Sequence, residues 1–262
     1  MQIESSDSAH PIHAFIQAQA GTTVTAPPYV PYDPAVREPV HDEIDEFFAK
    51  LFPREDLRVF MWRLLASHLA PTNREELFVI WHGPGANGKT ALMNLMKHAM
   101  CNYAGSLDTS ILTRRGLSAN LPDVIMTIQD KLFIYVQEPD EQEPLNTSII
   151  KRLTSDTPTV RGKINMACNS LPPITNIDGG MFRRLCVIPF ESRFVESGNP
   201  DINPEHNVYA MDRELDEKLS RWSYSFLSRL VWVYENEYRT YGLSPTPDVV
   251  IAATDVYKRQ VV

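Results

Sequence analysis

Eight consecutive residues, GPGANGKT at positions 83–90, restrict the fold of this chain more than any other feature of its sequence. They fit the pattern GxxxxGK[ST], in which glycines let the backbone curl until its N–H groups point inward at phosphate oxygens. A run of strand length, LFVIW, precedes this loop, and apolar residues at helical spacing follow it. The segment therefore predicts a strand, a phosphate-binding loop and a helix whose positive end faces the phosphate.

The loop residues are the candidate nucleotide ligands, namely Gly83, Pro84, Gly85, Ala86, Asn87, Gly88, Lys89 and Thr90. Lys89 can reach the β- and γ-phosphates of a bound nucleotide, and the Thr90 hydroxyl can bind Mg²⁺. The chain contains no NKxD motif, the pattern that reads a guanine base. We therefore expect ATP, together with Mg²⁺ as its cofactor, rather than GTP.

Four apolar runs of strand length are separated by helical or loop segments. They are Leu77–Trp81, Leu132–Val136, Ile164–Cys168 and Leu185–Ile188. Because these runs are apolar almost without alternation, we expect both faces of each strand to be buried, as in a parallel sheet covered by helices. The sequence thus predicts an α/β fold: a P-loop core with a mainly parallel sheet, and α-helical segments before and after it.

Polar residues stand beside these runs at positions suited to ATP hydrolysis. Glu138 directly follows the second run; it can orient and deprotonate the attacking water, and it is a candidate metal ligand beside Thr90. Asn169 follows the third run, where its amide can hydrogen-bond the γ-phosphate or the water. Arg183 and Arg184 precede the fourth run, and such a pair can reach the γ-phosphate of a neighbouring subunit as an arginine finger.

Composition and period divide the chain into four segments. Residues 1–35 are rich in Ala, Thr and Pro without a helical period, which predicts a disordered segment or a linker. Residues 36–76 carry apolar residues at steps of three and four, which predict two amphipathic helices. Residues 77–205 hold the P-loop core. Residues 206–262 contain a long helix that ends at Gly242, in a segment that we expect to be truncated.

The net charge and the cysteines restrict the partners and the compartment. The net charge is −8, so any contact with nucleic acid has to come from a local basic element. Apolar runs are at most five residues long, too short for a transmembrane helix, and we expect no membrane partner. The three cysteines lack CxxC spacing and stand among apolar residues. They predict buried thiols and a reducing compartment such as the cytoplasm.

The motifs, in this order, resemble those of superfamily 3 helicases. The similar stretches are WHGPGANGKT, KLFIYVQEPDEQEPLN, IIKRLT, MACNSLPPI and DGGMFRRLCVIPF. The resemblance is greatest to the helicase domain of viral and of phage- or plasmid-type primase–helicases, especially those of large DNA viruses. It runs from about Val40 to the C-terminus. It implies a core of AAA+ type that assembles into hexameric rings and couples ATP hydrolysis to translocation along DNA, usually for replication.

Carried onto this chain, the resemblance makes residues 83–90 the Walker A motif, Glu138 the Walker B acid and Asn169 the sensor asparagine. It leaves open which of Arg183 and Arg184 is the finger. A primase domain is implied on an N-terminal part absent from this sequence, and the host-cell cytoplasm is implied as the location.

The resemblance also implies a DNA-contacting element between the Walker B strand and the sensor strand. In this interval the chain has several cations, of which Lys151, Arg161 and Lys163 are the candidate contacts with single-stranded or forked DNA. Relatives usually carry a longer insert there, which forms a β-hairpin in the ring channel. In this chain the hairpin is shortened or absent, because Arg161 runs almost directly into the sensor strand.

Two other functions stay open. An AAA+ ATPase that remodels proteins is disfavoured by the basic cluster near the expected channel. A nucleotide-binding scaffold without unwinding activity is disfavoured because the chain retains the full set of candidate hydrolytic residues.

Overall fold

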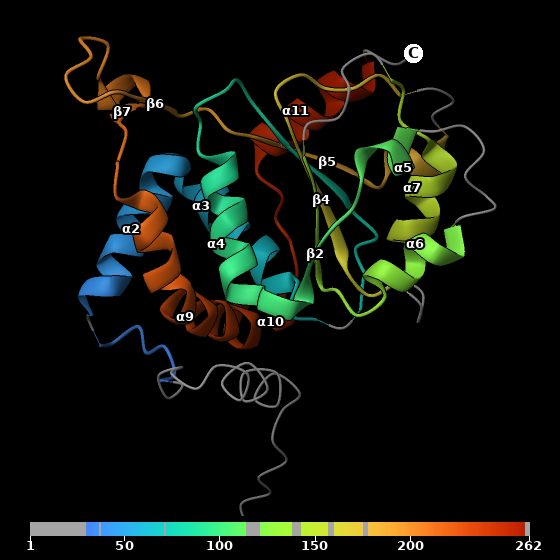
Figure 1. Cartoon of the computed structure of the whole chain (residues 1–262), viewed down its shortest axis with the longest axis horizontal. Helices are drawn as coiled ribbons and strands as arrows, with labels where there is room; N and C mark the ends of the chain where they lie inside the picture. The colour runs from blue at the N-terminus through green and yellow to red at the C-terminus, as the bar shows by residue number, and fades with distance from the viewer. Residues whose placement is uncertain are drawn as a thin grey trace, which may run out of the picture.

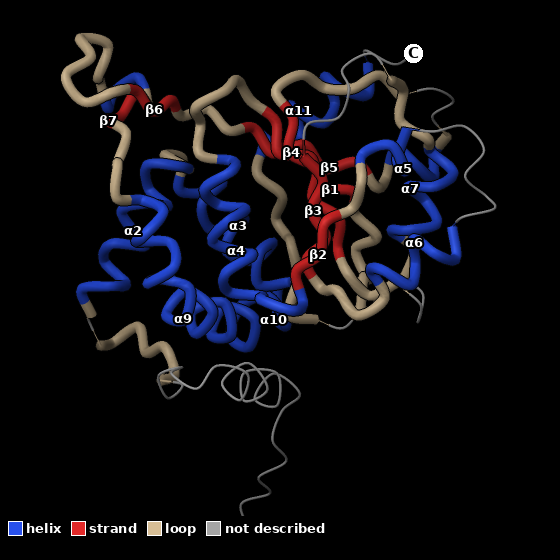
Figure 2. Tube along the Cα trace, in the orientation of Figure 1, coloured by secondary structure: helices blue, strands red, loops and turns tan. Residues whose placement is uncertain are grey.

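A five-stranded parallel sheet runs through the centre of the computed structural model (Figure 2), with the strand order β2-β3-β4-β1-β5. The strands are β1 (Phe78–His82), β2 (Ala104–Ser106), β3 (Phe133–Gln137), β4 (Lys163–Cys168) and β5 (Leu185–Pro189). Every neighbouring pair is parallel, so the predicted α/β fold is confirmed. The structure describes residues 30–36, 38–70, 72–113, 121–137, 143–156, 160–174 and 178–259.

Helices cover both faces of the sheet (Figure 1). The helices on one face are α2 (Pro39–Leu51), α3 (Glu55–Ser67), α4 (Lys89–Met100) and α9 (Leu215–Val233). Those on the other are α5 (Thr109–Thr113), α6 (Leu121–Ile128) and α7 (Thr147–Thr154). Helix α11 (Asp248–Arg259) lies along the edge strand β5, where the Val187 N–H donates to Thr254 Oγ1 at 2.9 Å. This contact satisfies a donor that an edge strand would otherwise expose.

The alternation of side chains along β1 explains why its sequence is apolar throughout. Val79 and Trp81 pack into the core on the α4 side, whereas Phe78 and Ile80 pack into the core on the α7 side. The apolar runs therefore became β1, β3, β4 and β5 as predicted. Strand β2 was not predicted, because its residues AGS offer no apolar run.

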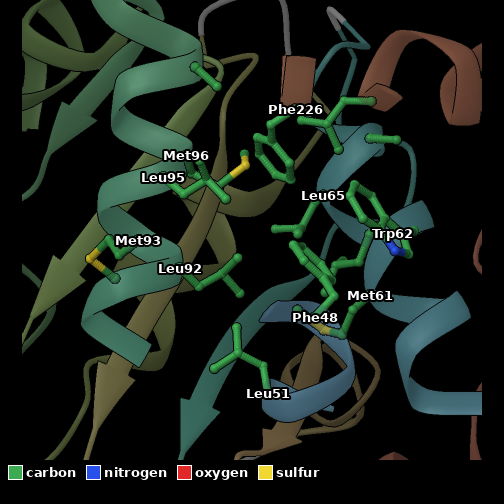
Figure 3. Packing of buried hydrophobic residues seen from close by; sticks show 14 of the residues in the cluster. Phe48, Leu51, Met61, Trp62, Leu65, Leu92, Met93, Leu95, Met96 and Phe226 are labelled. Atoms are coloured by element: carbon green, nitrogen blue, oxygen red, sulfur yellow. The ribbon is translucent and has the colours of Figure 1, made fainter. Parts of the chain in front are cut away.

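Helices that precede and follow the core in sequence form one layer. Figure 3 shows Phe48 of α2 and Trp62 of α3 beside Leu92 and Met96 of α4 and Phe226 of α9. The rings of Phe48 and Trp62 are stacked with centroids 4.1 Å apart. The two amphipathic helices predicted before the core are thus present, and their apolar stripes face α4 and α9.

The chain after α9 stays helical through a π-helical turn (Tyr234–Tyr238) and α10 (Arg239–Tyr241). The helical segment ends at Gly242, whose φ of 57° is positive, a backbone angle that glycine adopts more readily than other residues. The remaining elements are short: η1 (Cys101–Tyr103), α8 (Gly179–Phe182), η3 (Pro204–His206), β6 (Arg193–Val195) and β7 (Val208–Ala210). Strands β6 and β7 pair with each other outside the main sheet (Figure 1) and were not predicted.

Other sequence predictions have different outcomes. Cys168 and Cys186 are buried, but Cys101 is exposed after the last turn of α4, so the prediction of a buried thiol is wrong there. None of the helices in the described ranges combines the length and apolar character that crossing a bilayer requires. Most of the predicted linker, residues 1–29, lies outside the described residues, and the boundaries of the four segments stay predictions.

Candidate functional site

The predicted phosphate-binding loop, residues 83–88, joins the carboxyl end of β1 to the first residue of α4. Two of its glycines are required by close packing. A Cβ atom on Gly83 would lie 2.5 Å from the Phe190 carbonyl oxygen, and one on Gly88 would lie 2.2 Å from Leu51 Cδ2. Gly88 also has a φ of 85°, and Ala86 has a φ of 58° despite its side chain. The loop is therefore a strained, closely packed structure, as expected of a ligand-binding turn.

The side chain of Lys89 lies back across the loop. Its ammonium donates to the Gly83 carbonyl oxygen at 2.5 Å and to Asn87 Oδ1 at 3.1 Å. It also donates to Asn169 Oδ1 at 3.1 Å, across 80 positions of sequence. The predicted neighbourhood of Lys89 and Asn169 is thus present in the structure.

Asn87 braces the loop against the segment that follows β5. Its side chain is almost fully buried, and Asn87 Nδ2 donates to the Phe190 carbonyl oxygen at 3.4 Å. The Phe194 N–H, in β6, donates to the Ala86 carbonyl oxygen at 2.7 Å. This second support of the loop could not be predicted from the sequence, because nothing in residues 190–195 indicates which residues they contact.

The first turn of α4 is suited to phosphate. The N-cap residue, Gly88, has no side chain, the Lys89 N–H donates to Asn87 Oδ1 at 3.4 Å, and a Cβ atom on Gly85 would meet nothing within 4 Å. The positive end of the α4 dipole therefore lies at this loop, beside the Lys89 ammonium. The residues of this loop and of the first turn of α4 fit a nucleoside triphosphate.

The donor set at the loop also fits Mg²⁺. Thr90, the candidate metal ligand, is exposed at the start of α4. The described residues contain no cluster of three His, Cys, Asp or Glu that could hold a metal ion alone. Mg²⁺ is bound by few protein ligands and by the phosphates of its nucleotide, so Thr90 and a carboxylate suffice.

The strand that leads to Glu138 ends at the same edge of the sheet. Gln137, the last residue of β3, is in register with Ala167 of β4, two residues before Asn169. Gln137 Nε2 lies 3.1 Å from the Met93 sulfur of α4. Glu138 itself lies outside the described residues.

His82, the last residue of β1, was not singled out from the sequence. Its ring is hydrogen-bonded to the backbone of Asn169. Burial lowers the pKa of His82 below its usual value, and the nearby Lys89 charge lowers it further. The ring of His82 therefore lies next to the backbone of Asn169, beside the loop. The only signal in the sequence is that this histidine directly precedes the glycine-rich motif.

The two arginines lie at the opposite edge of the sheet. The Phe78 N–H, at the amino end of β1, donates to the Arg184 carbonyl oxygen at 2.7 Å. The loop follows the other end of β1, about 13 Å away at the usual rise per residue. The arginines therefore flank the amino ends of the strands, whereas Lys89 and Asn169 flank the carboxyl ends.

The predicted DNA contacts have different environments. Arg161 is exposed, and Lys151 forms an ion pair with Asp178 at 2.6 Å. Lys163 is only 4% exposed, and its ammonium donates to the Ser67 and Thr72 carbonyl oxygens at 2.7 and 2.8 Å. The prediction that Lys163 contacts DNA is therefore wrong, because its charge is already bound inside the protein. Burial lowers the pKa of Lys163 to about 8.

The loop between α7 and β4 is short, as the sequence suggested. Its described residues, 155–156 and 160–162, form no hairpin strand.

The chain is similar to proteins of large DNA viruses. A mimivirus protein (Acanthamoeba polyphaga mimivirus) named "Putative helicase L207/L206" is 32% identical over 239 residues, which are 83% of this chain and 24% of that protein. "Putative helicase 022R" of Frog virus 3 is 28% identical over 82% of this chain and 24% of its own length. An African swine fever virus protein named "Putative primase C962R" is 26% identical over 89% of this chain and 25% of its own length.

The chain thus spans about a quarter of the length of these curated relatives. No family model matches it. Among solved structures, the apo C-terminal region of NrS-1 superposes with a TM-score of 0.56 at 13% identity, covering 93% of this chain and 66% of that one. This likeness shows a shared fold. The resemblance to helicases and primases of large DNA viruses, inferred from the motifs, is confirmed by the sequence relatives.

Proposed function

We propose that this chain is the ATP-hydrolysing segment of a superfamily 3 DNA helicase, active as a ring of identical subunits. The observation that carries the proposal is the contact of Lys89 Nζ with Asn169 Oδ1 at the loop, 3.1 Å apart. A cation from the phosphate-binding loop and an amide from a neighbouring strand converge where a γ-phosphate would lie. The viral relatives named helicases support the same reading.

Hydrolysis would divide among the residues as follows. Lys89 binds the β- and γ-phosphates and neutralises charge that develops on them. Asn169 hydrogen-bonds the γ-phosphate or the attacking water, and Glu138 takes the proton of that water. Thr90 and Glu138 would hold Mg²⁺, which would neutralise negative charge on the phosphates of the nucleotide.

The arginines favour an assembly. Arg183 and Arg184 lie at the sheet edge away from the loop of their own chain, so a finger role requires the loop of a neighbouring subunit. A closed ring, hexameric as in the family, gives every loop one such neighbour. The primase domain proposed for the remainder of the protein is consistent with a relative named a primase.

DNA is the proposed track of the ring. Arg161 is exposed just before β4, and Lys151 lies in the last turn of α7. Contacts of such cations with phosphates give binding without base preference. The short loop before β4 limits the number of these contacts, so we expect weak binding by this segment alone.

A second candidate function, remodelling of protein by an AAA+ ATPase, is favoured by one observation. Of the three predicted DNA cations, one is buried and one is paired with Asp178. The two functions differ in whether single-stranded DNA stimulates hydrolysis.

The deciding experiment measures the ATPase rate with and without single-stranded DNA, alongside the mass of the oligomer. Lys89→Ala is the inactive reference, and Lys97→Ala is its matched control, because Lys97 lies on the same helix and bonds Asn94. We expect DNA to raise the rate of the parent and of Lys97→Ala, and Lys89→Ala to be inactive. Hydrolysis that DNA leaves unchanged would favour the remodelling function.

A further inference from the structure

Glu76 lies two residues before the first residue of β1, in a backbone conformation that its side chain disfavours. Its φ is 51°, in the left-handed region, where glycine or asparagine is the usual residue. Its N–H donates to the Asn73 carbonyl oxygen at 2.9 Å and closes the turn that leads into the sheet. A glutamate at a strained position indicates that its carboxylate is needed there.

That carboxylate bonds both arginines. Glu76 Oε2 accepts from Arg183 at 2.8 Å and from Arg184 at 2.9 Å. The two guanidiniums differ in exposure, since the side chain of Arg184 is 6% exposed and that of Arg183 is 65% exposed. One carboxylate therefore joins a buried arginine to one that faces outward.

Arg184 is fixed by its other partners. Its guanidinium donates to Thr154 Oγ1 at 3.1 Å and to the Gly180 carbonyl oxygen at 2.8 Å. It also lies 3.3 Å from Ser155 Oγ. With these contacts Arg184 cannot extend to another subunit, and it anchors Glu76 to the end of α7.

The turn that carries Glu76 is anchored to α7 as well. Asn73 is fully buried, and its Nδ2 donates to the Thr154 carbonyl oxygen at 2.9 Å. The Asn73 N–H donates to Asp156 Oδ1 at 2.9 Å. The backbone of Glu76 is thus held by Asn73 and its side chain by Arg184, independently of the contact that it makes with Arg183.

We propose that Arg183 is the residue that reaches the neighbouring subunit's nucleotide and that Glu76 is its positioning residue, fixed in turn by Arg184. The proposal rests on the proposed function, because it needs hydrolysis at an interface between subunits. A carboxylate held from two sides restricts the Arg183 guanidinium to few orientations, which lowers the entropy lost when it meets a phosphate. A side chain as exposed as that of Arg183 would otherwise sample many rotamers.

The test compares Glu76→Gln with the parent. Glutamine keeps the shape and one acceptor oxygen but removes the charge that holds the two guanidiniums. We expect kcat to fall about 10- to 100-fold, as for a misplaced catalytic group, while the nucleotide Kd stays unchanged. The matched control is Glu237→Gln, since Glu237 also bonds an arginine, Arg63, at 3.1 Å in a partly buried pair. This control should keep the parental kcat.

Two further measurements separate positioning from support of the fold. In an Arg183→Ala background, Glu76→Gln should lower kcat no further, because the group that it positions is gone. Mixing Glu76→Gln subunits with Glu138→Gln subunits should restore activity, because some interfaces then pair an intact loop with an intact finger. Losses that multiply in the double variant, or mixed rings without recovery, would overturn the proposal.

The ATPase activity of the parent protein distinguishes a failure of the Glu76 proposal from a failure of the proposed function. If the parent hydrolyses ATP and Glu76→Gln keeps its kcat, the positioning role of Glu76 is wrong and the proposed function stands. If the parent hydrolyses no ATP in any assembly, both fall together.

Discussion

The ammonium of Lys89 lies 3.1 Å from the side-chain oxygen of Asn169. These residues follow adjacent strands, because His82 of β1 is in register with Cys168 of β4. Parallel strands bring their carboxyl ends to one edge, where ligands of α/β proteins bind. The sheet therefore aims a cation and an amide at one point, and this geometry permits predictions about individual residues.

Asn169→Ala should separate nucleotide binding from turnover. The alanine leaves the loop and Lys89 in place, so the nucleotide Kd should change little. It removes a hydrogen bond to the γ-phosphate or to the water, which we expect to lower kcat about 100-fold. Steady-state ATPase assays and nucleotide titration measure the two quantities. The control is Ser170→Ala at the next exposed position, and equal kcat values for both variants would exclude a sensor role.

Glu138→Gln should bind nucleotide and lose hydrolysis. The amide keeps the size of the carboxylate but cannot accept the proton of the attacking water. The matched control is Glu143→Gln in the same acidic stretch, since the Glu143 carboxylate already accepts a hydrogen bond from Thr113 Oγ1 at 2.6 Å. Single-turnover hydrolysis with prebound nucleotide is the measurement. Parental turnover in Glu138→Gln would show that another group takes the proton.

Much of the fold could be predicted because burial on two faces leaves a strong signal. The first four residues of β1, FVIW, are all apolar, because successive side chains such as those of Val79 and Ile80 pack into different cores. The loop was predictable for a related reason: Gly83 and Gly88 meet backbone or side-chain atoms that exclude a Cβ. In both cases a local requirement fixes the residue type.

The features that escaped prediction depend on partners far away in sequence. Lys163 appears among cations in the sequence, yet its ammonium is bound by carbonyl oxygens of residues 67 and 72, about 90 positions earlier. Glu76 belongs to no recognisable sequence motif, and its role is inferred only from its contacts with Arg183 and Arg184 in the folded chain. Backbone carbonyls are available at every residue, so a sequence cannot indicate which of them a lysine will meet.

The buried His68 predicts a pH dependence of stability. Burial first, and the Lys163 charge second, lower the pKa of His68 to about 3 from 6.5. Between these values the unfolded chain holds a proton that the folded chain lacks, so the free energy of unfolding falls as pH is lowered through this window. The slope is on the order of 1 kcal/mol per pH unit. Above pH 6.5 His68 is mostly neutral in both the folded and the unfolded chain, so this loss of stability is absent there.

The measurement is denaturant unfolding from pH 4 to pH 7 for the parent and for His68→Gln. Glutamine can still donate to the Leu64 carbonyl oxygen and accept from Asn165, the contacts that His68 makes. It does not titrate, so the difference in free energy of unfolding between the two proteins should shift steadily across this range. A constant difference would mean that His68 is protonated without cost in the folded state.

Arg161 and Lys163 form a matched pair for testing contact with DNA. They are two positions apart and carry the same charge, but Arg161 is exposed and Lys163 is buried. Arg161→Ala should weaken single-strand binding equally for all sequences and lower the slope of log K against log salt by about 0.7, the value for one lost phosphate contact. Lys163→Met should leave this slope unchanged and lower the free energy of unfolding, because two carbonyl oxygens lose their donor.

Salt titrations of oligonucleotide binding and denaturant unfolding of the same preparations give both quantities. If Lys163→Met lowers the salt slope as much as Arg161→Ala, the ammonium leaves its buried site in the DNA complex. If neither changes it, the DNA track lies on another part of the chain.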